Sequence, residues 1–341
     1  METQSKKVAV LILNWNGRDL LERFLPSVCT HNSTFAEIVV VDNASTDSSI
    51  AFLKEFYPHI KRIEFNVNFG FAEGYNKAIS LVENEYVVLL NSDVRVTENW
   101  LIDPISFLNN NKEYAACQPK ILDEKDPTKF EYAGACGGYL DYLGYPFCRG
   151  RVFDYLEIDT GQYNTVKDIF WASGAAMFVS RELYIEVGGL DASFFAHQEE
   201  IDLCWRFLNK NQKIACIPTS TVYHLGGASL DKMNPKKTYL NFRNNLVMLL
   251  KNLPISALPL IFFRMVLDGV AGLKFISEGK FNHCWAIVKA HFSFYTRIPS
   301  TLLKRKNTQQ IRNSLMFSTS IIIHYFIKKN KTFSDIINSI K

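Results

Sequence analysis

The sequence is poor in the residues that build fibrous or repetitive chains. It has only 17 glycines and 11 prolines among 341 residues, which excludes a collagen-like or low-complexity architecture. It shows no repeat of about 20–50 residues, which argues against solenoids and propellers. The hydrophobic share of 48% and the charged share of 21% are instead typical of a globular protein. The length suits one large domain or two smaller ones.

The sequence also lacks a cysteine framework and an export signal. Its seven cysteines form no CxxC pair and their number is odd. We therefore expect reduced thiols that pack as small hydrophobic side chains. The first apolar run, Val8–Leu13, is too short for a signal-peptide core, and Asn14 ends it. These features predict a cytoplasmic protein.

Long uncharged runs are absent, and charge is distributed unevenly. No uncharged run reaches the length of about 18 residues that a simple membrane-spanning helix needs, so none is expected. Residues 251–341 contain 14 Lys+Arg and 3 Asp+Glu, a net +11, whereas residues 1–250 contain 24 and 31, a net −7. We expect a main domain over 1–250 and a basic, apolar helical region over 251–341.

The basic C-terminal region has two interpretations. Its apolar stretches, interleaved with Lys and Arg, are typical of amphipathic helices that lie on an anionic membrane surface. They equally fit helices that pack on the protein and leave a basic face in water. We expect no nucleic-acid partner, because the main domain is acidic and no nucleic-acid-binding motif is present.

The first ninety residues alternate strand and helix patterns. Short β-branched and aliphatic runs predict buried strands, and apolar residues at helical spacing separate them. This order predicts a mostly parallel sheet with helices on both faces. The predicted strands are Val8–Leu13, Ile38–Val41, Ile63–Phe65 and Tyr86–Leu90, and the predicted helices are Gly17–Cys29, Ser45–Tyr57 and Phe71–Val82.

The middle of the chain is harder to interpret. Residues 120–165 are rich in Gly, Tyr, Asp and Pro, so we expect loops and a hairpin there, with a mobile flap as one form. Further strands and helices follow. The strands are expected at Phe170–Val179, Ile214–Pro218 and Val222–His224, and the helices at Arg181–Val187, Glu199–Lys210 and Tyr239–Leu250.

Polar residues follow the predicted strands, where ligands bind in open parallel sheets. Asp42 can accept hydrogen bonds from a base or ribose, although a turn or a helix cap is the alternative. Asp93 suits a hard divalent cation such as Mg²⁺ or Mn²⁺, which takes oxygen ligands and bridges carboxylate to phosphate. Gly70 and Gly74 lie at a helix start, where backbone can approach a phosphate.

Three further patterns carry chemistry. Glu199, Glu200 and Asp202 crowd negative charge at a helix start, which either supplies a general base or complements the helix dipole. His224 precedes two glycines and is either a metal ligand or a structural histidine. The stretch Trp171–Ala176 suits a sugar ring or, alternatively, core packing. Neither GxGxxG nor a P-loop occurs, which disfavours dinucleotide enzymes and P-loop NTPases.

Taken in order, eight stretches make the sequence resemble the family 2 glycosyltransferases with the GT-A fold, especially the rhamnosyltransferase-like branch. The resemblance covers about residues 6–250. The stretches are VAVLILNWNG (8–17), VVVDNASTD (39–47), NFGFAEGYN (68–76), LLNSDV (89–94), SGAAM (173–177), GGLDASFF (188–195), EEIDLCWR (199–206) and HLGGAS (224–229).

The resemblance implies a fold, an activity and roles for particular residues. It implies a Rossmann-like α/β fold and an inverting hexosyl- or deoxyhexosyltransferase with a UDP- or dTDP-sugar donor. Glu200 would be the catalytic base, with Glu199 as its rival. Asp93 and His224 would hold Mn²⁺ or Mg²⁺, although Asn91 replaces the first Asp of the family's metal motif.

The resemblance also implies donor and acceptor sites. The residues assigned to the nucleotide sugar are Asn14, Asn16, Asp42, Asn68, Gly70, Gly74, Asn76, Asn91, Ser92, Asp93 and Arg243. Those assigned to the acceptor are Trp171, Ser173, Gly174 and Asp202. The acceptor would be a growing surface polysaccharide such as O-antigen or capsule, held on lipid, so the basic region would contact the inner face of the plasma membrane.

Two other functions remain open from the sequence. A sugar nucleotidyltransferase would share the sheet, the nucleotide and the metal, but residues 13–18 lack the Gly-rich, basic character of a triphosphate loop. A non-catalytic carbohydrate-binding protein of the membrane surface would fit the basic region, but it would leave Asp93, Glu200 and His224 without a purpose.

Overall fold

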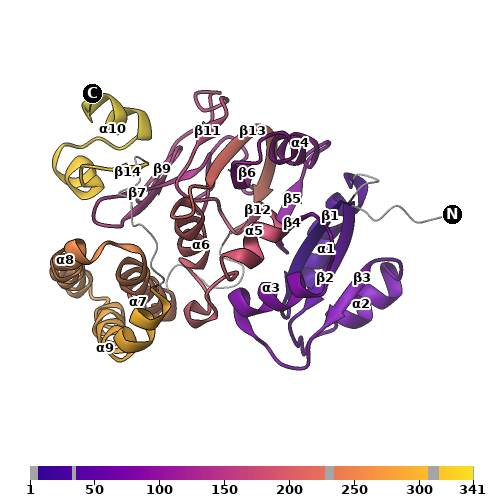
Figure 1. The fold of residues 1–341 in the computed structure, drawn as a ribbon, viewed down its shortest axis with the longest axis horizontal. Helices are drawn as coiled ribbons and strands as arrows, with labels where there is room; N and C mark the ends of the chain where they lie inside the picture. The colour runs from indigo at the N-terminus through magenta and orange to yellow at the C-terminus, as the bar shows by residue number, and fades with distance from the viewer. Residues whose placement is uncertain (1–6, 33–35, 227–233, 306–314, 341) are drawn as a thin grey trace.

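The computed structural model describes residues 7–32, 36–226, 234–305 and 315–340. Its centre is a nine-stranded sheet of order β11-β13-β6-β12-β4-β1-β2-β3, to which β5 adds by pairing with β13 (Figure 1). The strands of this sheet are β1 (Val8–Asn14), β2 (Ala36–Asp42), β3 (Lys61–Glu64), β4 (Tyr86–Asn91), β5 (Val94–Val96), β6 (Tyr114–Asp123), β11 (Lys167–Asp168), β12 (Ala176–Ser180) and β13 (Lys213–His224).

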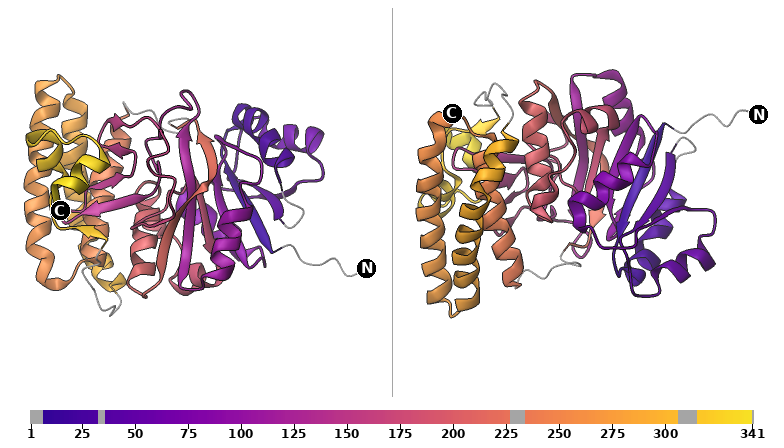
Figure 2. Two further views of the ribbon diagram at one scale, coloured as in Figure 1. Left: turned by 90° about the horizontal axis from the view of Figure 1, so that it is seen from above. Right: turned by 60° about the horizontal axis from the view of Figure 1, so that its bottom comes forward.

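A smaller sheet and ten helices complete the described fold (Figure 2). The smaller sheet has the order β10-β9-β8-β7-β14. Its strands are β7 (Gly138–Asp141), β8 (Pro146–Cys148), β9 (Arg151–Val152), β10 (Tyr155–Leu156) and β14 (Met316–Phe317). The helices are α1 (Arg18–Thr30), α2 (Ser49–Phe56), α3 (Gly70–Ser80), α4 (Ile102–Asn110), α5 (Arg181–Glu186), α6 (Glu199–Leu208), α7 (Pro235–Asn252), α8 (Leu258–Ser277), α9 (Phe281–Lys304) and α10 (Phe333–Ile340).

The N-terminal half of the large sheet is parallel, as predicted. Strand β1 pairs in parallel with β2 and β4, and β2 pairs in parallel with β3. The residues Val8–Leu11 of β1 are fully buried, because helices cover both faces of this strand. A continuous apolar run is what such a position requires. The expected α/β class with a mostly parallel sheet is therefore confirmed for this half.

The C-terminal half of the sheet departs from the expected strand boundaries. Strand β12 is antiparallel to both β4 and β6, and it begins only at Ala176. The preceding residues of the expected strand bend away to bond other segments, since the N–H of Ser173 donates to the Gln118 side chain. The two short strands expected at 214–224 are one strand, β13, with a register shift between Ile217 and Thr221.

The hairpin expected within residues 120–165 is confirmed, and it belongs to the smaller sheet. Strands β7 and β8 make a hairpin, and β14 from the C-terminal region pairs with β7. Phe333 of α10 packs against this sheet, with its ring centroid 5.2 Å from that of Tyr139. Composition concealed these strands because each has only two to four residues.

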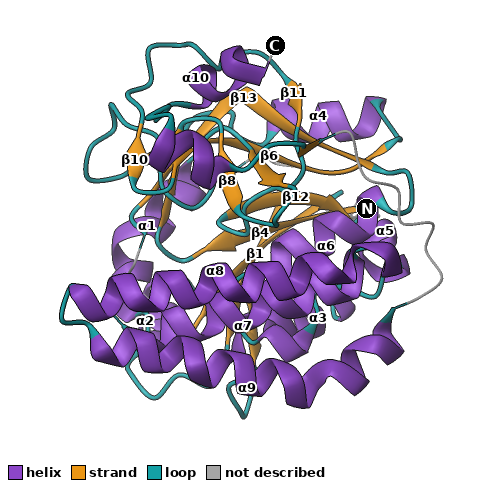
Figure 3. Ribbon diagram, turned by 90° about the vertical axis from the view of Figure 1, so that its left-hand side faces the viewer, coloured by secondary structure: helices purple, strands orange, loops and turns teal. Residues whose placement is uncertain are grey.

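Helices α7, α8 and α9 pack against one another at one side of the molecule, the side that faces the viewer in Figure 3. Helix α7 packs against α6 of the main domain as well. The expected domain boundary at 250/251 therefore falls inside α7, whose range is Pro235–Asn252. The segment Ile255–Ser277 is long and apolar enough to cross a membrane by length and composition alone, even though Arg264 and Asp268 interrupt it.

Candidate active site

The carboxyl ends of three parallel strands bring the predicted polar residues to one edge of the sheet. Asn14 at the end of β1 is in register with Asp42 at the end of β2, and Leu13 is in register with Asn91 at the end of β4. The N–H of Asn91 donates to the carbonyl of Ala175, 3.0 Å away, just before β12. The strand ends and the segment before β12 are therefore continuous.

Asp42 is held by its neighbours at this edge. Its carboxylate accepts hydrogen bonds from Nδ2 of Asn14 (3.0 Å) and from the N–H of Ser45 (2.9 Å), and it is 3% exposed. Asn14 is fully buried, so it positions Asp42. It does not face a ligand, contrary to the expectation from the sequence. Asn16 is exposed and joins the two loops, since its Oδ1 accepts from the N–H of Thr46 at 2.7 Å. Contact of Asp42 or Asn16 with a nucleotide stays a prediction.

Asp93 and His224 meet, although 131 residues separate them in the chain. Nε2 of His224 lies 3.1 Å from Oδ1 of Asp93 and 3.4 Å from Nδ2 of Asn91. Strand β5 enforces this meeting, because it pairs Val94 with His224. Ser92 is partly exposed beside them. The last three residues of the motif 224–229 lie outside the described residues.

Glu131 is a third member of this cluster, and it was missed in the sequence. Its Oε1 lies 3.4 Å from Nδ1 of His224, on the side of the ring opposite Asp93. Burial alone would lower the pKa of His224, but the carboxylates of Glu131 and Asp93 raise it to about 10. Burial would raise the pKa of Asp93, and His224 lowers it instead. Nothing in the sequence around Glu131 marks it, because 93 residues separate it from His224.

Asp93 and His224 are residue types that bind divalent cations, but with a pKa of about 10 the imidazole is protonated at neutral pH, so a cation would have to displace its proton. Carboxylate oxygen and imidazole nitrogen are both ligands for Mn²⁺, and such ions are often completed by water and substrate phosphates. Among the described residues no group of three His, Cys, Asp or Glu side chains forms a complete metal-binding set. The residues therefore fit a cation that a diphosphate would share.

Glu199 and Glu200 occupy the first turn of α6 but differ in exposure. Glu199 is 4% exposed, whereas Glu200 is partly exposed. Oε2 of each carboxyl is buried and has no hydrogen-bond partner among the described residues. Burial raises the pKa of Glu200 to about 7, and burial together with the charge of Glu200 raises the pKa of Glu199. A carboxyl with a pKa near neutrality can act as a general base at neutral pH, and this role for Glu200 stays a prediction.

The segment before α6 is strained, and helix α7 holds it. Phe195, His197 and Gln198 have positive φ angles of 66°, 70° and 73°, which non-glycine residues rarely adopt. Nδ2 of Asn244 donates to the carbonyls of Phe194, Ala196 and His197 at 2.7–3.1 Å.

Arg243 of α7 also holds the segment before α6. Its Nη2 donates to the carbonyl of Phe194 at 2.9 Å, and the residue is 5% exposed. The expected contact of Arg243 with a diphosphate is therefore replaced by support of the segment that precedes Glu199 and Glu200.

The glycines of the motif at residues 68–76 pack closely against neighbouring side chains. A Cβ on Gly70 would lie 2.8 Å from the ring of Phe195, and one on Gly74 would lie 3.1 Å from Leu13. The N–H of Gly70 already donates to Oδ1 of Asn68. These glycines are therefore needed for packing, and the expected approach to a phosphate is not needed to explain them.

Asn76 is likewise engaged inside the protein. Its Nδ2 donates to the carbonyl of Leu190 at 2.8 Å, while its Oδ1 accepts from the hydroxyl of Tyr184 at 2.7 Å. The side chain fastens α3 to the loop after α5. Asn76 is partly exposed, so its contact with the nucleotide sugar stays a prediction.

Two residues assigned to the acceptor are core residues. Trp171 is 2% exposed, and its indole N–H donates to the carbonyl of Tyr139 at 3.0 Å. Asp202 is fully buried and bonds Lys251 (2.9 Å) and Arg206 (2.9 Å). Neither side chain reaches a surface, so both assignments are corrected.

The other two acceptor assignments, Ser173 and Gly174, belong to the segment beside the base. Ser173 is buried, with its Oγ accepting from the N–H of Ala175 at 3.2 Å. A Cβ on Gly174 would lie 4.0 Å from Cβ of Glu200. Because Ala175 bonds Asn91, this segment links the first turn of α6 to the end of β4.

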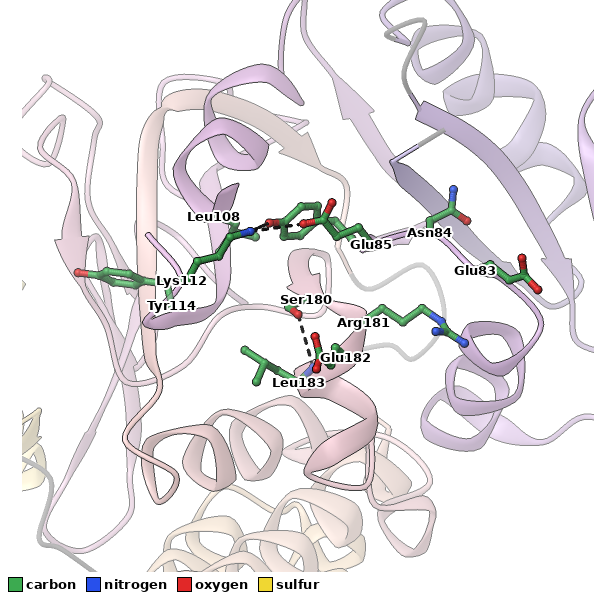
Figure 4. A pocket seen from close by; sticks show the side chains of 11 residues that line it. Glu83, Asn84, Glu85, Leu108, Lys112, Tyr114, Ser180, Arg181, Glu182 and Leu183 are labelled. Carbon is green, nitrogen blue, oxygen red and sulfur yellow. Dashed lines mark hydrogen bonds and ion pairs between the residues drawn. The ribbon is translucent and has the colours of Figure 1, made fainter. Parts of the chain in front are cut away.

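A hollow of about 400 Å³ lies at the opposite edge of the sheet (Figure 4). Its lining includes Tyr86 at the start of β4 and Ser180 at the end of β12. Nζ of Lys112 bonds the hydroxyl of Tyr86 at 2.8 Å and Glu85 at 3.4 Å. None of the predicted site residues lines it, so the candidate site is defined by the strand ends and not by this hollow.

Comparison with known proteins gives a family match and several relatives. The family model described as "Glycosyl transferase family 2" matches residues 9–183, just over half of the chain. The low-salt glycan biosynthesis hexosyltransferase Agl10 of Haloferax volcanii is 24% identical over 250 residues, which cover 71% of this chain and 75% of that protein.

Two rhamnosyltransferases are similar over somewhat shorter stretches. N-acetylglucosaminyl-diphospho-decaprenol L-rhamnosyltransferase of Mycobacterium tuberculosis is 23% identical, with 63% of this chain and 75% of that protein covered. Rhamnosyltransferase WbbL of Escherichia coli is 22% identical, with 64% and 83% covered.

Solved structures share the fold at lower identity. GalNAc-T7 with UDP, GalNAc and Mn²⁺ superposes with a TM-score of 0.59 at 14% identity, over 91% of this chain and 59% of that chain. The mannosyltransferase PcManGT of Pyrobaculum calidifontis, in complex with GDP-Man and Mn²⁺, has a TM-score of 0.53 at 14% identity, over 86% and 88%. The chain therefore has the GT-A fold that was expected.

Proposed function

Because the chain belongs to glycosyltransferase family 2, in its rhamnosyltransferase-like part, we propose that it transfers a hexosyl or deoxyhexosyl group with inversion. The donor is a UDP- or dTDP-sugar, and the acceptor is a hydroxyl of a glycan, held on lipid. The relative Agl10 is a hexosyltransferase of low-salt glycan biosynthesis and WbbL is a rhamnosyltransferase, which supports this substrate class.

One observation carries the proposal. Glu200 is a partly exposed residue whose carboxyl has a pKa raised to about 7, and it lies next to the segment that bonds the end of β4. A carboxylate so placed removes the proton of the acceptor hydroxyl as its oxygen attacks the anomeric carbon. The bond from that carbon to the diphosphate breaks, and the nucleoside diphosphate leaves. A single displacement needs no covalent enzyme intermediate, so the anomeric centre inverts.

Asp93 and His224 would hold the divalent cation, Mn²⁺ or Mg²⁺. When bound, the cation offsets the negative charge that develops on the leaving diphosphate. The structures of GalNAc-T7 and PcManGT contain Mn²⁺, which supports its use here. Glu131 orients the imidazole from the other side, and Asn91 contacts it as well.

The location of the enzyme follows from its acceptor. A lipid-linked glycan that receives sugars from cytoplasmic nucleotide donors stands at the inner face of the plasma membrane. We therefore propose that the chain works in the cytoplasm at that face. The family match concerns sugar transfer and so disfavours a sugar nucleotidyltransferase.

The test of the reaction compares Glu200→Gln with Glu199→Gln. A panel of UDP-, dTDP- and GDP-sugars is screened for transfer and for slow hydrolysis in the presence of Mn²⁺. For the accepted donor, Glu200→Gln should lower kcat by about 10²–10⁴-fold, because the amide cannot take the proton. Donor affinity, measured by calorimetry, should stay within about threefold of that of the wild type.

Glu199→Gln is the matched control, since it changes a buried neighbour in the same turn. It should retain at least about a tenth of the wild-type kcat. Loss of turnover in this control, with turnover retained in Glu200→Gln, would transfer the base assignment to Glu199. Release of inorganic diphosphate from a nucleoside triphosphate would instead support the nucleotidyltransferase.

The metal assignment has its own test. Asp93→Asn should weaken Mn²⁺ binding in the presence of the nucleoside diphosphate by about tenfold or more, because a charged oxygen ligand is lost. Electron paramagnetic resonance of free Mn²⁺ measures the binding directly. Unchanged Mn²⁺ affinity in Asp93→Asn would remove this residue from the proposed metal site.

A further inference from the structure

The outward surface of α8 and α9 is apolar. The outer face, as we call it, consists of side chains that are each at least 49% exposed. They are Phe262, Phe263, Val266, Val270 and Leu273 of α8 and Phe281, Trp285, Phe292 and Tyr295 of α9. Their spacing of three or four residues places them on one side of each helix. The two helices lie side by side across the surface shown in Figure 3.

The inner side of α8 is charged, the reverse of an ordinary surface helix. Arg264 and Asp268 are 5% and 1% exposed and bond each other at 2.9 Å. Arg264 also donates to Oδ1 of Asn245 on α7, and its guanidinium lies 3.6 Å from the ring centroid of Tyr145. A buried ion pair therefore helps to fix α8 to the protein, together with buried Ile261, while the apolar residues of the outer face point away from the protein.

Exposed basic side chains accompany the outer face. Lys274 and Lys289 are exposed on the same two helices, and Lys328 and Lys329 are exposed after the short helix 323–327. That helix adds exposed Phe326 and Ile327, and Nζ of Lys274 lies 5.7 Å from the ring centroid of Phe326.

Acidic side chains are scarce in the same region. Between residues 253 and 340 they are Asp268, Glu278 and Asp335, and Asp268 is buried. The surface is thus apolar with a basic margin, which is complementary to anionic lipid head groups above acyl chains. Patches of this kind mark interaction sites.

We propose that the outer face docks on an anionic lipid bilayer, with α8 and α9 lying in the plane of the membrane interface. The segment Ile255–Ser277 would not cross the bilayer, because Arg264 and Asp268 are already bonded inside the protein. Trp285 and Tyr295 are of the residue types enriched at the depth of lipid head groups. This inference shares the proposed membrane location, but it does not depend on the proposed reaction.

The experiment measures binding of the full chain to vesicles, without donor or acceptor. Vesicles of phosphatidylcholine with phosphatidylglycerol should sediment the protein, whereas phosphatidylcholine alone should bind it at least about tenfold more weakly. High salt should weaken binding to the anionic vesicles. Trp285 should become less polar in its surroundings, so the fluorescence should shift to the blue.

Substitutions locate the contact. The triple change Phe262→Ser, Leu273→Ser and Phe292→Ser should reduce vesicle binding by about tenfold or more, with the thermal midpoint preserved because the three side chains are exposed. The matched control is Phe56→Ser, Val67→Ser and Ile158→Ser, three exposed apolar residues elsewhere on the chain. The control should bind as the wild type does. The blue shift should vanish in Trp285→Phe and persist in Trp15→Phe.

Three results would overturn the inference. The first is equal vesicle binding by the outer-face triple variant and its control. The second is retention in cell membranes after alkaline carbonate extraction, which would indicate a spanning helix. The third is a dimer that the triple variant dissociates, in the absence of vesicle binding, which would assign the outer face to a second copy. Each result is independent of whether any sugar is transferred.

Discussion

At the scale of single residues, the proposed reaction depends on two neighbouring carboxyl groups at the start of α6. Glu199 and Glu200 are neighbours, yet only Glu200 combines partial exposure with a pKa near neutrality. The positive φ angles of the segment before them, and the bonds from Asn244, hold this turn in place. Strain that the surrounding structure holds in this way is typical of functional sites.

The pH dependence of the reaction should report the ionisation of Glu200. A base must be deprotonated, so kcat/KM should rise with pH and level off above about 7, with a value at pH 6 about tenfold below the plateau. Initial rates between pH 5 and 9 at low donor concentration measure this limb.

Glu199→Gln tests which carboxyl the limb reports. The limb should persist in this variant, because burial and not Glu199 raises the pKa of Glu200. A flat profile in Glu199→Gln would contradict the assignment.

The candidate residues could be predicted from the sequence only where a strand end marks them. Asp93 and His224 were found because each follows an apolar run, and the sheet brings the runs together. Glu131 and Asn244 were missed, since the contacts that bring them to the site are with residues 47 to 93 positions away and no local pattern shows such contacts. Trp171 and Asp202 were misassigned because polarity and size in a motif do not reveal burial.

Among the elements, length and periodicity decided what could be predicted. The four N-terminal strands and α1 were found because continuous apolar runs or helical spacing define them. A hairpin was expected within residues 120–165, but the individual strands of the small sheet were not placed, since pairing partners and not local sequence select strands of two to four residues. Helix α2 begins at Ser49, shortly after residues 45–47. The carboxylate of Asp47 accepts a hydrogen bond from the N–H of Ser49 and so caps the start of the helix.

Helix α3 offers a prediction about the close approach of two elements. Gly70 and Gly279 both have positive φ angles, 75° and 73°, but a Cβ would meet Phe195 at Gly70 and nothing within 4 Å at Gly279. Gly279→Ala should lower the free energy of unfolding by about 1 kcal/mol through its backbone alone. Gly70→Ala should lower it by about 2–4 kcal/mol, because crowding of the aromatic ring is added.

Urea unfolding of both variants measures the difference between them. Equal losses in the two proteins would show that the ring of Phe195 moves aside freely.

For the whole molecule, one buried cluster of charges connects the C-terminal helices to the main domain. Lys251 of α7 lies 2.8 Å from Asp191 and 2.9 Å from Asp202, and Lys304 of α9 lies 2.6 Å from Asp191. Burial alone would raise the pKa of each aspartate, but Lys251 lowers both. The region after residue 250 is therefore bound to the main domain by charge as well as by packing.

Replacement of Lys251 should lower the stability of the folded protein. Lys251→Met leaves Asp202 buried with fewer partners, so the free energy of unfolding should fall by about 3 kcal/mol. The exposed pair of Lys210 and Glu186 supplies the control, and Lys210→Met should cost less than about 0.5 kcal/mol. Chemical denaturation at pH 7 measures both.

The same variant should respond differently to acid. The depressed pKa values of Asp191 and Asp202 stabilise the folded protein above the pKa of about 3.9 that aspartate has in the unfolded chain. That stabilisation is lost as the pH falls below this value. The acid limb of stability should therefore be shallower in Lys251→Met, and identical acid limbs would argue against the cluster.

The stacking of α6, α7 and the outer helices has a geometric consequence for the acceptor. Neighbouring packed helices lie about 8–10 Å apart, and α7 lies between α6, which carries Glu200, and the pair α8–α9. With the outer face on lipid, the base stands roughly 16–20 Å above the head groups. Under the proposed docking, helix α7 and the pair α8–α9 together separate Glu200 from the lipid. A lipid carrier too short to bring its terminal hydroxyl to that height would not be a substrate, however well its sugar fits.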